Sequence, residues 1–182
     1  MSSNRPVLIL QCPSYFIALD ILEKDCGHKP VSVPMSPDGT GVDVTELEEA
    51  VKREHAKRVD PGKGKFWAMF YTIPTFHNPT GSVMSPEKCS KVVELARRYD
   101  FVVVCDDVYN LLHYGPGSKS PKRLLAYDVA SHSEYKVNRE NSFLAFTSRF
   151  PFCPTRVILF DSTSSRENVS SLKFSPVKLQ LS

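Results

Sequence analysis

The sequence predicts an α/β fold in which crossover helices connect the strands of a mostly parallel sheet. Its 182 residues, 41% hydrophobic and 24% charged, have the composition of a globular domain. Residues 66–71 and 101–105 are almost wholly apolar, as expected of strands buried on both faces. A helical pattern at 85–99 separates them. Parallel neighbouring strands require such a crossover, so the three segments predict a strand–helix–strand unit.

The first part of the chain alternates in the same way. In chain order, we expect a strand at Val7–Leu10, a helix at 15–24 that Gly27 ends, a strand at Pro30–Pro34, a turn at 36–39, and a helix that begins near Asp43 and ends in the basic stretch 52–58. Asp43 or Thr45 is the expected N-cap of this last helix. Its basic end suits the helix dipole, so we interpret it as a solvated helix end and not as a nucleic-acid site.

The helix at 85–99 carries the clearest start signal. Ser85 is a suitable N-cap, and Pro86 stands at the first helical position, where its missing N–H costs nothing. Its buried face is expected to comprise Val92, Val93, Leu95, Ala96 and Tyr99.

The chain lacks the patterns of several other classes of protein. No run of about 18 apolar residues is present, so we expect no membrane span. No Cys-x-x-Cys pair or histidine spacing suggests a metal site, and five separate cysteines indicate free thiols in the reducing cytoplasm. The net charge of +3 comes from scattered basic residues, which argues against a nucleic-acid partner.

The pattern changes near residue 136. Residues 156–160 are a candidate strand, but the serine-rich segment 161–182 has little to build a core. We therefore divide the chain into a domain at 5–135 and a divergent tail at 136–182 that we expect to be poorly ordered.

Polar signatures follow both buried strands. Asn78 comes after the first strand, and Asp106 ends the second, 28 positions later. Because ligands of parallel sheets bind beyond the carboxyl ends of the strands, we expect these two side chains at one edge of the sheet.

These signatures resemble a known family. Asn78–Gly81 (Asn-Pro-Thr-Gly) and Asp106–Tyr109 (Asp-Asp-Val-Tyr) resemble the class I/II aminotransferases that depend on pyridoxal phosphate, as do 12–16 and 34–39 in the expected order. The similarity is greatest to the branch of aminoadipate and aromatic aminotransferases. It implies a partial large domain of the aspartate aminotransferase fold over roughly residues 5–135.

The resemblance also implies roles for four residues. Asp106 would stand against the ring nitrogen of pyridoxal 5'-phosphate, where a carboxylate favours the protonated ring. Asn78 and Tyr109 would donate hydrogen bonds to the phenolate oxygen, and Tyr15 would stack on the ring. Each also has a structural alternative: Asn78 as the start of an Asn-Pro turn, Asp106 as a helix cap, and the two tyrosines as core.

The family pattern is incomplete in this sequence. The lysine that forms the Schiff base ends a Ser-x-x-Lys segment in the family, but Ser165 stands where it is expected after the strand at 156–160. Lys173 is a weak candidate, ahead of Lys136 and Lys178, because 170–173 fits the Ser-x-x-Lys letters. Nothing resembles the family's Gly-rich phosphate turn or its carboxyl-terminal domain with the substrate-binding arginine, so we expect a truncated form with some exposed apolar surface.

The resemblance implies transfer of an amino group between an amino acid and a 2-oxo acid, by enzymes that form homodimers when full-length. We expect this chain alone to have little or no such activity. Two alternatives remain: a catalytically dead chain that acts by interaction, and another enzyme of the same fold, such as a carbon–sulfur lyase or a cyclopropane-carboxylate synthase.

Overall fold

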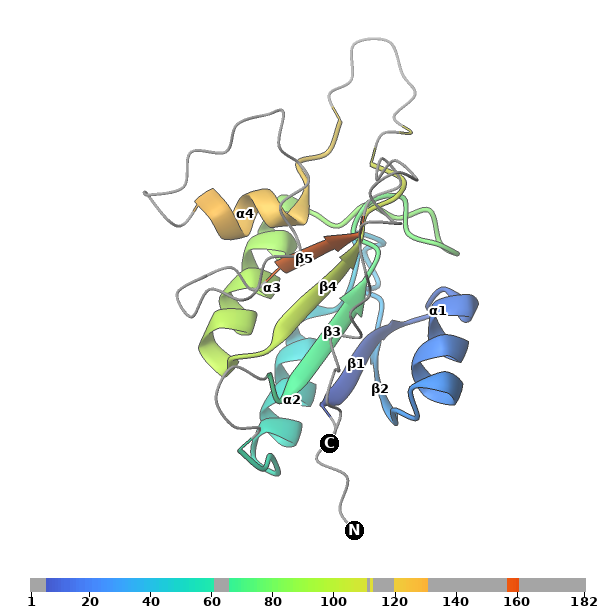
Figure 1. The fold of residues 1–182 in the computed structure, drawn as a ribbon. Helices are drawn as coiled ribbons and strands as arrows, with labels where there is room; N and C mark the ends of the chain where they lie inside the picture. Colours follow the sequence, from blue (N-terminus) through green and yellow to red (C-terminus); the bar gives the residue numbers. More distant parts are fainter. Residues whose placement is uncertain (1–5, 61–65, 111, 113–119, 131–156, 161–182) are drawn as a thin grey trace, which may run out of the picture.

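The fold is a parallel sheet with helices on both faces (Figure 1). The computed structural model describes residues 6–60, 66–110, 112, 120–130 and 157–160. Within these residues the sheet has five strands in the order β2-β1-β3-β4-β5, all parallel to their neighbours. The strands are β1 (Val7–Cys12), β2 (Pro30–Pro34), β3 (Ala68–Thr72), β4 (Val102–Asp106) and β5 (Val157–Phe160).

The helices are divided unequally between the two faces. One face carries the helices α2 (Val44–His55), α3 (Pro86–Tyr99) and α4 (Leu124–Ala130), and the other carries α1 (Phe16–Asp20) with a π-helical turn, η1 (Ile21–Asp25) (Figure 1). The chain passes from β1 to β2 on one side and then returns to β3 on the other side of β1. The strand order therefore reverses between β1 and β3, and ligands of such sheets bind at this point.

Each face of the sheet has its own apolar cluster because side chains alternate along a strand. The larger cluster joins β3 and β4, through Phe70, Val103 and Cys105, to α2 and α3. The smaller one contains Leu8, Leu10, Tyr71 and Ile73 and packs against α1 and η1.

The predicted parallel α/β fold is confirmed. The strands predicted at 66–71 and 101–105 are present as β3 and β4, each beginning one or two residues later and ending one residue later than predicted. The residue before β3, Trp67, is buried and donates its indole N–H to the carbonyl of Tyr99 at 2.6 Å. The apolar run in the sequence therefore starts before the first residue of the strand, which explains why the predicted start was too early.

The predicted helix at 15–24 differs in form. It begins at Phe16 and changes after Asp20 into the π-helical turn. Its outer side leaves three large apolar side chains exposed, namely Phe16, Ile17 and Ile21. This agrees with the expectation of some exposed apolar surface.

The later part of the chain contributes the helix α4 and the strand β5. The helix α4 has no counterpart among the predicted elements. It is anchored by Arg97 of α3, which donates its Nε–H to the fully buried Asp128 at 2.9 Å. The strand predicted at 156–160 is present as β5, which pairs with β4. The rest of the tail at 136–182 lies outside the described residues.

The predicted helix starts are confirmed. Asp43 is the N-cap of α2 and accepts hydrogen bonds from the backbone N–H groups of Thr45 and Glu46. Ser85 is the N-cap of α3, and Pro86 stands at its first position.

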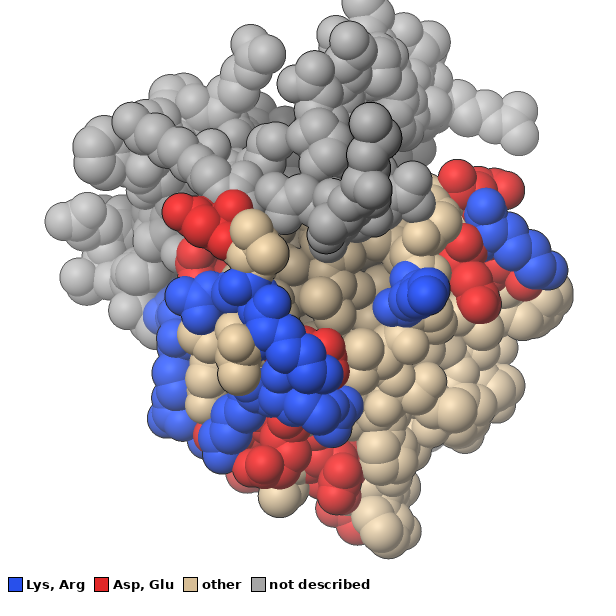
Figure 2. Space-filling view, turned by 90° about the horizontal axis from the view of Figure 1, so that it is seen from below, with Lys and Arg blue, Asp and Glu red and all other residues tan. Residues whose placement is uncertain are grey.

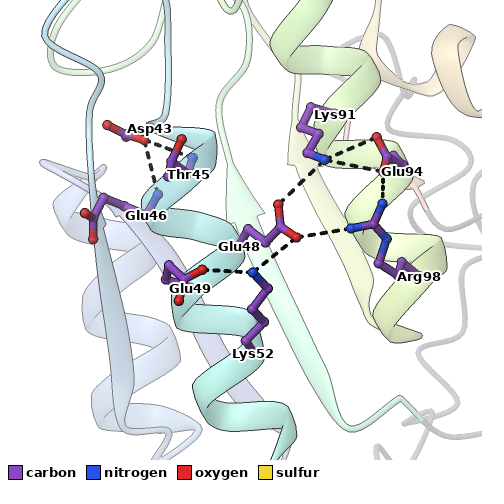
Figure 3. Close-up of polar contacts among 9 residues, drawn as sticks. All are labelled: Asp43, Thr45, Glu46, Glu48, Glu49, Lys52, Lys91, Glu94 and Arg98. Atoms are coloured by element: carbon purple, nitrogen blue, oxygen red, sulfur yellow. Dashed lines mark hydrogen bonds and ion pairs between the residues drawn. The ribbon is translucent and has the colours of Figure 1, made fainter.

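A network of charged side chains joins α2 to α3 (Figure 3). Glu48 of α2 lies at its centre, 3.1 Å from Arg98, 3.5 Å from Lys52 and 3.6 Å from Lys91. Partial burial by itself would raise the pKa of Glu48, but these cations outweigh it and hold the pKa below its ordinary value.

Acidic partners also surround the basic end of α2. Lys52 contacts Glu49 at 2.9 Å, and both Lys57 and Arg53 contact Glu54 at 3.1 Å. Figure 2 shows such blue and red side chains intermixed on the face seen from below. These pairs support the interpretation of the basic stretch as a solvated helix end.

Replacing Glu48 with Gln should destabilise the fold more than replacing Glu49 with Gln. Glu48 faces three cations from two helices, whereas Glu49 pairs with Lys52 alone. Because the pKa of folded Glu48 is lowered, its contribution is present above its unfolded pKa and is lost as the pH falls. Urea midpoints at pH 7 should show the difference, which should shrink at low pH and in about 0.5 M salt. Equal losses for the two variants would contradict the central position of Glu48.

Gly41 is required by its conformation and by its neighbour. Its φ of +104° lies in the region that side chains disfavour, and a Cβ would meet Met84 Cα at 3.0 Å. Gly39 also has a positive φ, +71°, but a Cβ there would meet nothing within 4 Å. The two glycines therefore share a positive φ and differ in their steric surroundings.

Gly41→Ala should cost more stability than Gly39→Ala. Both variants lose about 1–2 kcal/mol because the backbone has a positive φ. Gly41→Ala should lose about 1–3 kcal/mol more, through overlap with Met84 and through a φ farther from the left-handed region. Chemical denaturation of both variants measures the difference. If Gly39→Ala were as damaging, close packing on Met84 would not be the cause.

Candidate active site

The four predicted site residues lie in segments that follow three neighbouring strands. Tyr15 follows β1, Asn78 follows β3, Asp106 is the last residue of β4, and Tyr109 stands three residues later. All four are half-buried, between the closed core and the solvent. The sheet therefore delivers them to its carboxyl edge, next to the point where the strand order reverses.

Direct contacts connect these segments. The side-chain amide of Asn78 donates a hydrogen bond to the hydroxyl oxygen of Tyr109 at 3.3 Å. Tyr15 and Tyr109 both pack against the smaller apolar cluster, which contains Tyr71. Residues separated by more than 90 positions in the sequence thus share one side of the sheet edge.

Asp106 has a partner that the sequence analysis did not identify. The hydroxyl of Tyr71, on β3, donates a hydrogen bond to Asp106 Oδ2 at 2.7 Å. Burial raises the pKa of Tyr71 far above its ordinary value, and the hydrogen bond and the charge of Asp106 raise it further. Tyr71 therefore keeps its proton and acts as the donor in this pair.

The loop that carries Asn78 is closed by its own hydrogen bonds. The N–H of His77 donates to the carbonyl of Ser82 at 2.8 Å, and the N–H of Gly81 donates to the carbonyl of His77 at 2.5 Å. The His77 ring contacts the Thr80 hydroxyl at 2.8 Å through Nδ1. Asn78 thus lies in a tight turn that is closed by hydrogen bonds within the loop itself.

The far end of this loop is attached to the turn that follows β2. Lys88, in the first turn of α3, contacts both carboxylate oxygens of Asp38 at 2.9 and 3.1 Å. Beside this pair, the N–H of Ser85 donates to the carbonyl of Thr40 at 3.1 Å. The loop between β3 and α3 is therefore held by a strand at one end and by a neighbouring turn at the other.

The segment after Asp106 is anchored on the opposite face of the sheet. Asp107 is 1% exposed and lies 3.7 Å from Arg123. Arg123 also donates to the side-chain oxygen of Asn110 at 3.2 Å, and the Asn110 amide donates to the carbonyl of Pro121 at 3.0 Å. Neighbouring carboxylates thus have opposite surroundings, as strand alternation requires.

The polar side chains at this edge suit a charged aromatic ring. A carboxylate, an amide and a phenol hydroxyl are available to a ring nitrogen and a phenolate oxygen, and Tyr15 offers a flat face. Two further buried atoms nearby in the chain, Ser14 Oγ and His77 Nε2, have no hydrogen-bond partner among the described residues. Burial lowers the pKa of His77, which favours its neutral form. The residues present therefore fit pyridoxal phosphate.

Other expected features are only partly covered by the described residues. Lys173, Lys136, Lys178 and Ser165 lie outside them, so the lysine assignment stays a prediction. Within the described segments, no group of three possible metal ligands occurs. The same segments contain no helix with the length and hydropathy of a membrane span.

Sequence reasoning missed Tyr71 and Arg123. Tyr71 belongs to an apolar run and was interpreted as part of a buried strand, although a tyrosine in such a run needs a hydrogen-bond partner for its hydroxyl. That requirement was the available signal. Arg123 lies in a segment without periodicity, and its contact with Asp107 has no local signature.

Comparison with known proteins finds aminotransferases among the relatives of this chain. An aromatic-amino-acid aminotransferase of Thermococcus litoralis is 33% identical over 112 residues, which are 59% of this chain and 24% of that protein. The crystal structure of an archaeal alanine:glyoxylate aminotransferase is similar with a TM-score of 0.58 at 30% identity, covering 86% of this chain and 30% of that one.

A second solved structure is that of a kynurenine aminotransferase from Pyrococcus horikoshii, in complex with PMP. It is similar with a TM-score of 0.53 at 30% identity, covering 66% of this chain and 27% of that one. The chain thus spans less than a third of the length of each of these relatives. Residues 4–138, which include the whole of the domain predicted at 5–135, match the family described as aminotransferase class I and II, and the chain belongs to that family.

Proposed function

We propose that the chain contributes the ring-binding part of an aminotransferase that uses pyridoxal 5'-phosphate to exchange an amino group between an amino acid and a 2-oxo acid. The observation that supports this proposal is the hydrogen bond between Asn78 and Tyr109, together with the position of Asp106 at the end of β4 on the same carboxyl edge of the sheet. Family membership and a relative solved with PMP support it.

Each residue has a defined task in this proposal. Bound pyridoxal phosphate supplies an electron sink, which is strongest when its ring nitrogen is protonated. The carboxylate of Asp106 attracts that proton and holds it at the nitrogen. Asn78 and Tyr109 donate hydrogen bonds to the phenolate oxygen and stabilise its charge. Tyr15 orients the ring by stacking.

Further parts of the proposal follow from the family. The amino acid and the 2-oxo acid are the proposed substrates, the full-length protein is proposed to be a homodimer, and the cytoplasm is its proposed compartment. Lys173 remains the proposed, weak candidate for covalent attachment of the cofactor.

The chain should bind pyridoxal phosphate reversibly through these residues. We expect a saturable change in the cofactor's absorbance on titration. Asp106→Asn should weaken binding about tenfold or more, because the protonated ring nitrogen loses its carboxylate partner. Asn78→Ala should weaken binding less, because one hydrogen bond to the phenolate oxygen disappears. Asp25→Asn, at an exposed carboxylate in η1, is the matched control and should bind as the unmodified chain does. Equal affinity for all four proteins would contradict the proposed site.

Little or no transaminase activity is expected from this chain alone. The family uses a lysine to move the substrate proton, and this sequence has Ser165 where that lysine is expected. Borohydride reduction after addition of the cofactor, followed by peptide mapping, tests for covalent attachment. A single adduct at Lys173, together with turnover of an amino acid, would show that the chain carries its own catalytic lysine.

A further inference from the structure

Tyr71 lies on β3, next to the candidate site residue Asp106 of β4. Tyr71 pairs in register with Val104 of β4, and Asp106 lies two residues further along the same face of β4. Its side chain is only 6% exposed and packs in the smaller apolar cluster. A strand-borne phenol in such packing has little freedom, so its hydroxyl presents a fixed donor to Asp106.

The hydrogen bond leaves the two oxygens of Asp106 in different situations. Oδ2 accepts from Tyr71 at 2.7 Å, whereas Oδ1 accepts no hydrogen bond from the described residues. An ionised carboxylate can accept at both oxygens. One oxygen is therefore held by Tyr71, and the other has no hydrogen-bond donor within the described part of the chain.

We propose that Tyr71 is a positioning residue, whose hydroxyl holds Asp106 Oδ2 so that Oδ1 is presented to the ring nitrogen of pyridoxal phosphate. This inference rests on the proposed function of the site. It assigns Tyr71 an effect on the cofactor that operates through Asp106, because the Tyr71 hydroxyl donates its hydrogen bond to that carboxylate.

The first test is the affinity of a Tyr71→Phe variant for pyridoxal phosphate. The variant keeps the buried ring but loses the hydroxyl, and its dissociation constant should rise about three- to tenfold, as for loss of a hydrogen bond to a charged group. Tyr127→Phe is the matched control. Tyr127 lies on α4, and the centre of its ring is 4.4 Å from the ammonium nitrogen of Lys122. Its hydroxyl should make no difference to the binding of pyridoxal phosphate.

An analogue with carbon in place of the ring nitrogen separates positioning from packing. This 1-deaza compound has no nitrogen for Asp106 to meet, so the unmodified chain and Tyr71→Phe should bind it equally well. A general structural defect in Tyr71→Phe would instead weaken both ligands by the same factor, and that result would overturn the inference while leaving the proposed function intact. Equal affinity of the unmodified chain and Tyr71→Phe for pyridoxal phosphate would overturn it as well.

A measurement on the unmodified chain covers the case in which Tyr71→Phe does not fold. With tyrosine labelled by ¹³C at Cζ, the Tyr71 resonance should shift on addition of pyridoxal phosphate and should shift much less with the 1-deaza compound. Identical shifts with both ligands would contradict the role of Tyr71. If the unmodified chain binds neither ligand, the proposed function itself fails, and the inference fails with it.

Discussion

The register of β3 against β4 is the constraint on which the candidate site depends. In this register Tyr71 lies beside Val104, so that Tyr71 and Asp106 share a face, and Asp107 is directed to the other. A shift by one residue would place the carboxylate of Asp107 beside Tyr71 and would put Asp106 among the apolar side chains of α3. An unpaired charge in that core is costly, so the two consecutive carboxylates help to define a single pairing.

The two faces of the sheet make different contributions to this edge. The face covered by α2, α3 and α4 holds the larger core and the buried polar contacts of Asp107, Asn110 and Arg123. The face covered by α1 and η1 holds a smaller cluster and the side chains that fit an aromatic ring. The contacts that stabilise this edge thus lie on one face of the sheet, and the side chains that fit a ligand lie on the other. The anchored segment after β4 fixes the positions of Asp106 and Tyr109.

Much of this arrangement could be predicted because it rests on short-range patterns. Uniformly apolar runs identified β3 and β4, and Ser85 with Pro86 identified the start of α3. Parallel topology then implied that Asn78 and Asp106 meet at one edge. The contacts that escaped prediction are those between distant residues. Arg97 and Asp128 are 31 positions apart, and the residues next to each of them in the sequence form no pattern that predicts the contact. The hydroxyl of Tyr71 was hidden for a related reason, since its partner lies 35 positions away on another strand.

The double attachment of the loop between β3 and α3 has an energetic consequence for any ligand of this edge. One end of the loop continues from a central strand, and the other is fixed by the Lys88–Asp38 pair and by the backbone of Thr40. The conformational entropy of the Asn78 turn is therefore lost during folding, before a ligand arrives. A planar ligand then binds to an amide that is already in position, and the binding free energy of the ligand is not reduced by the cost of ordering the turn.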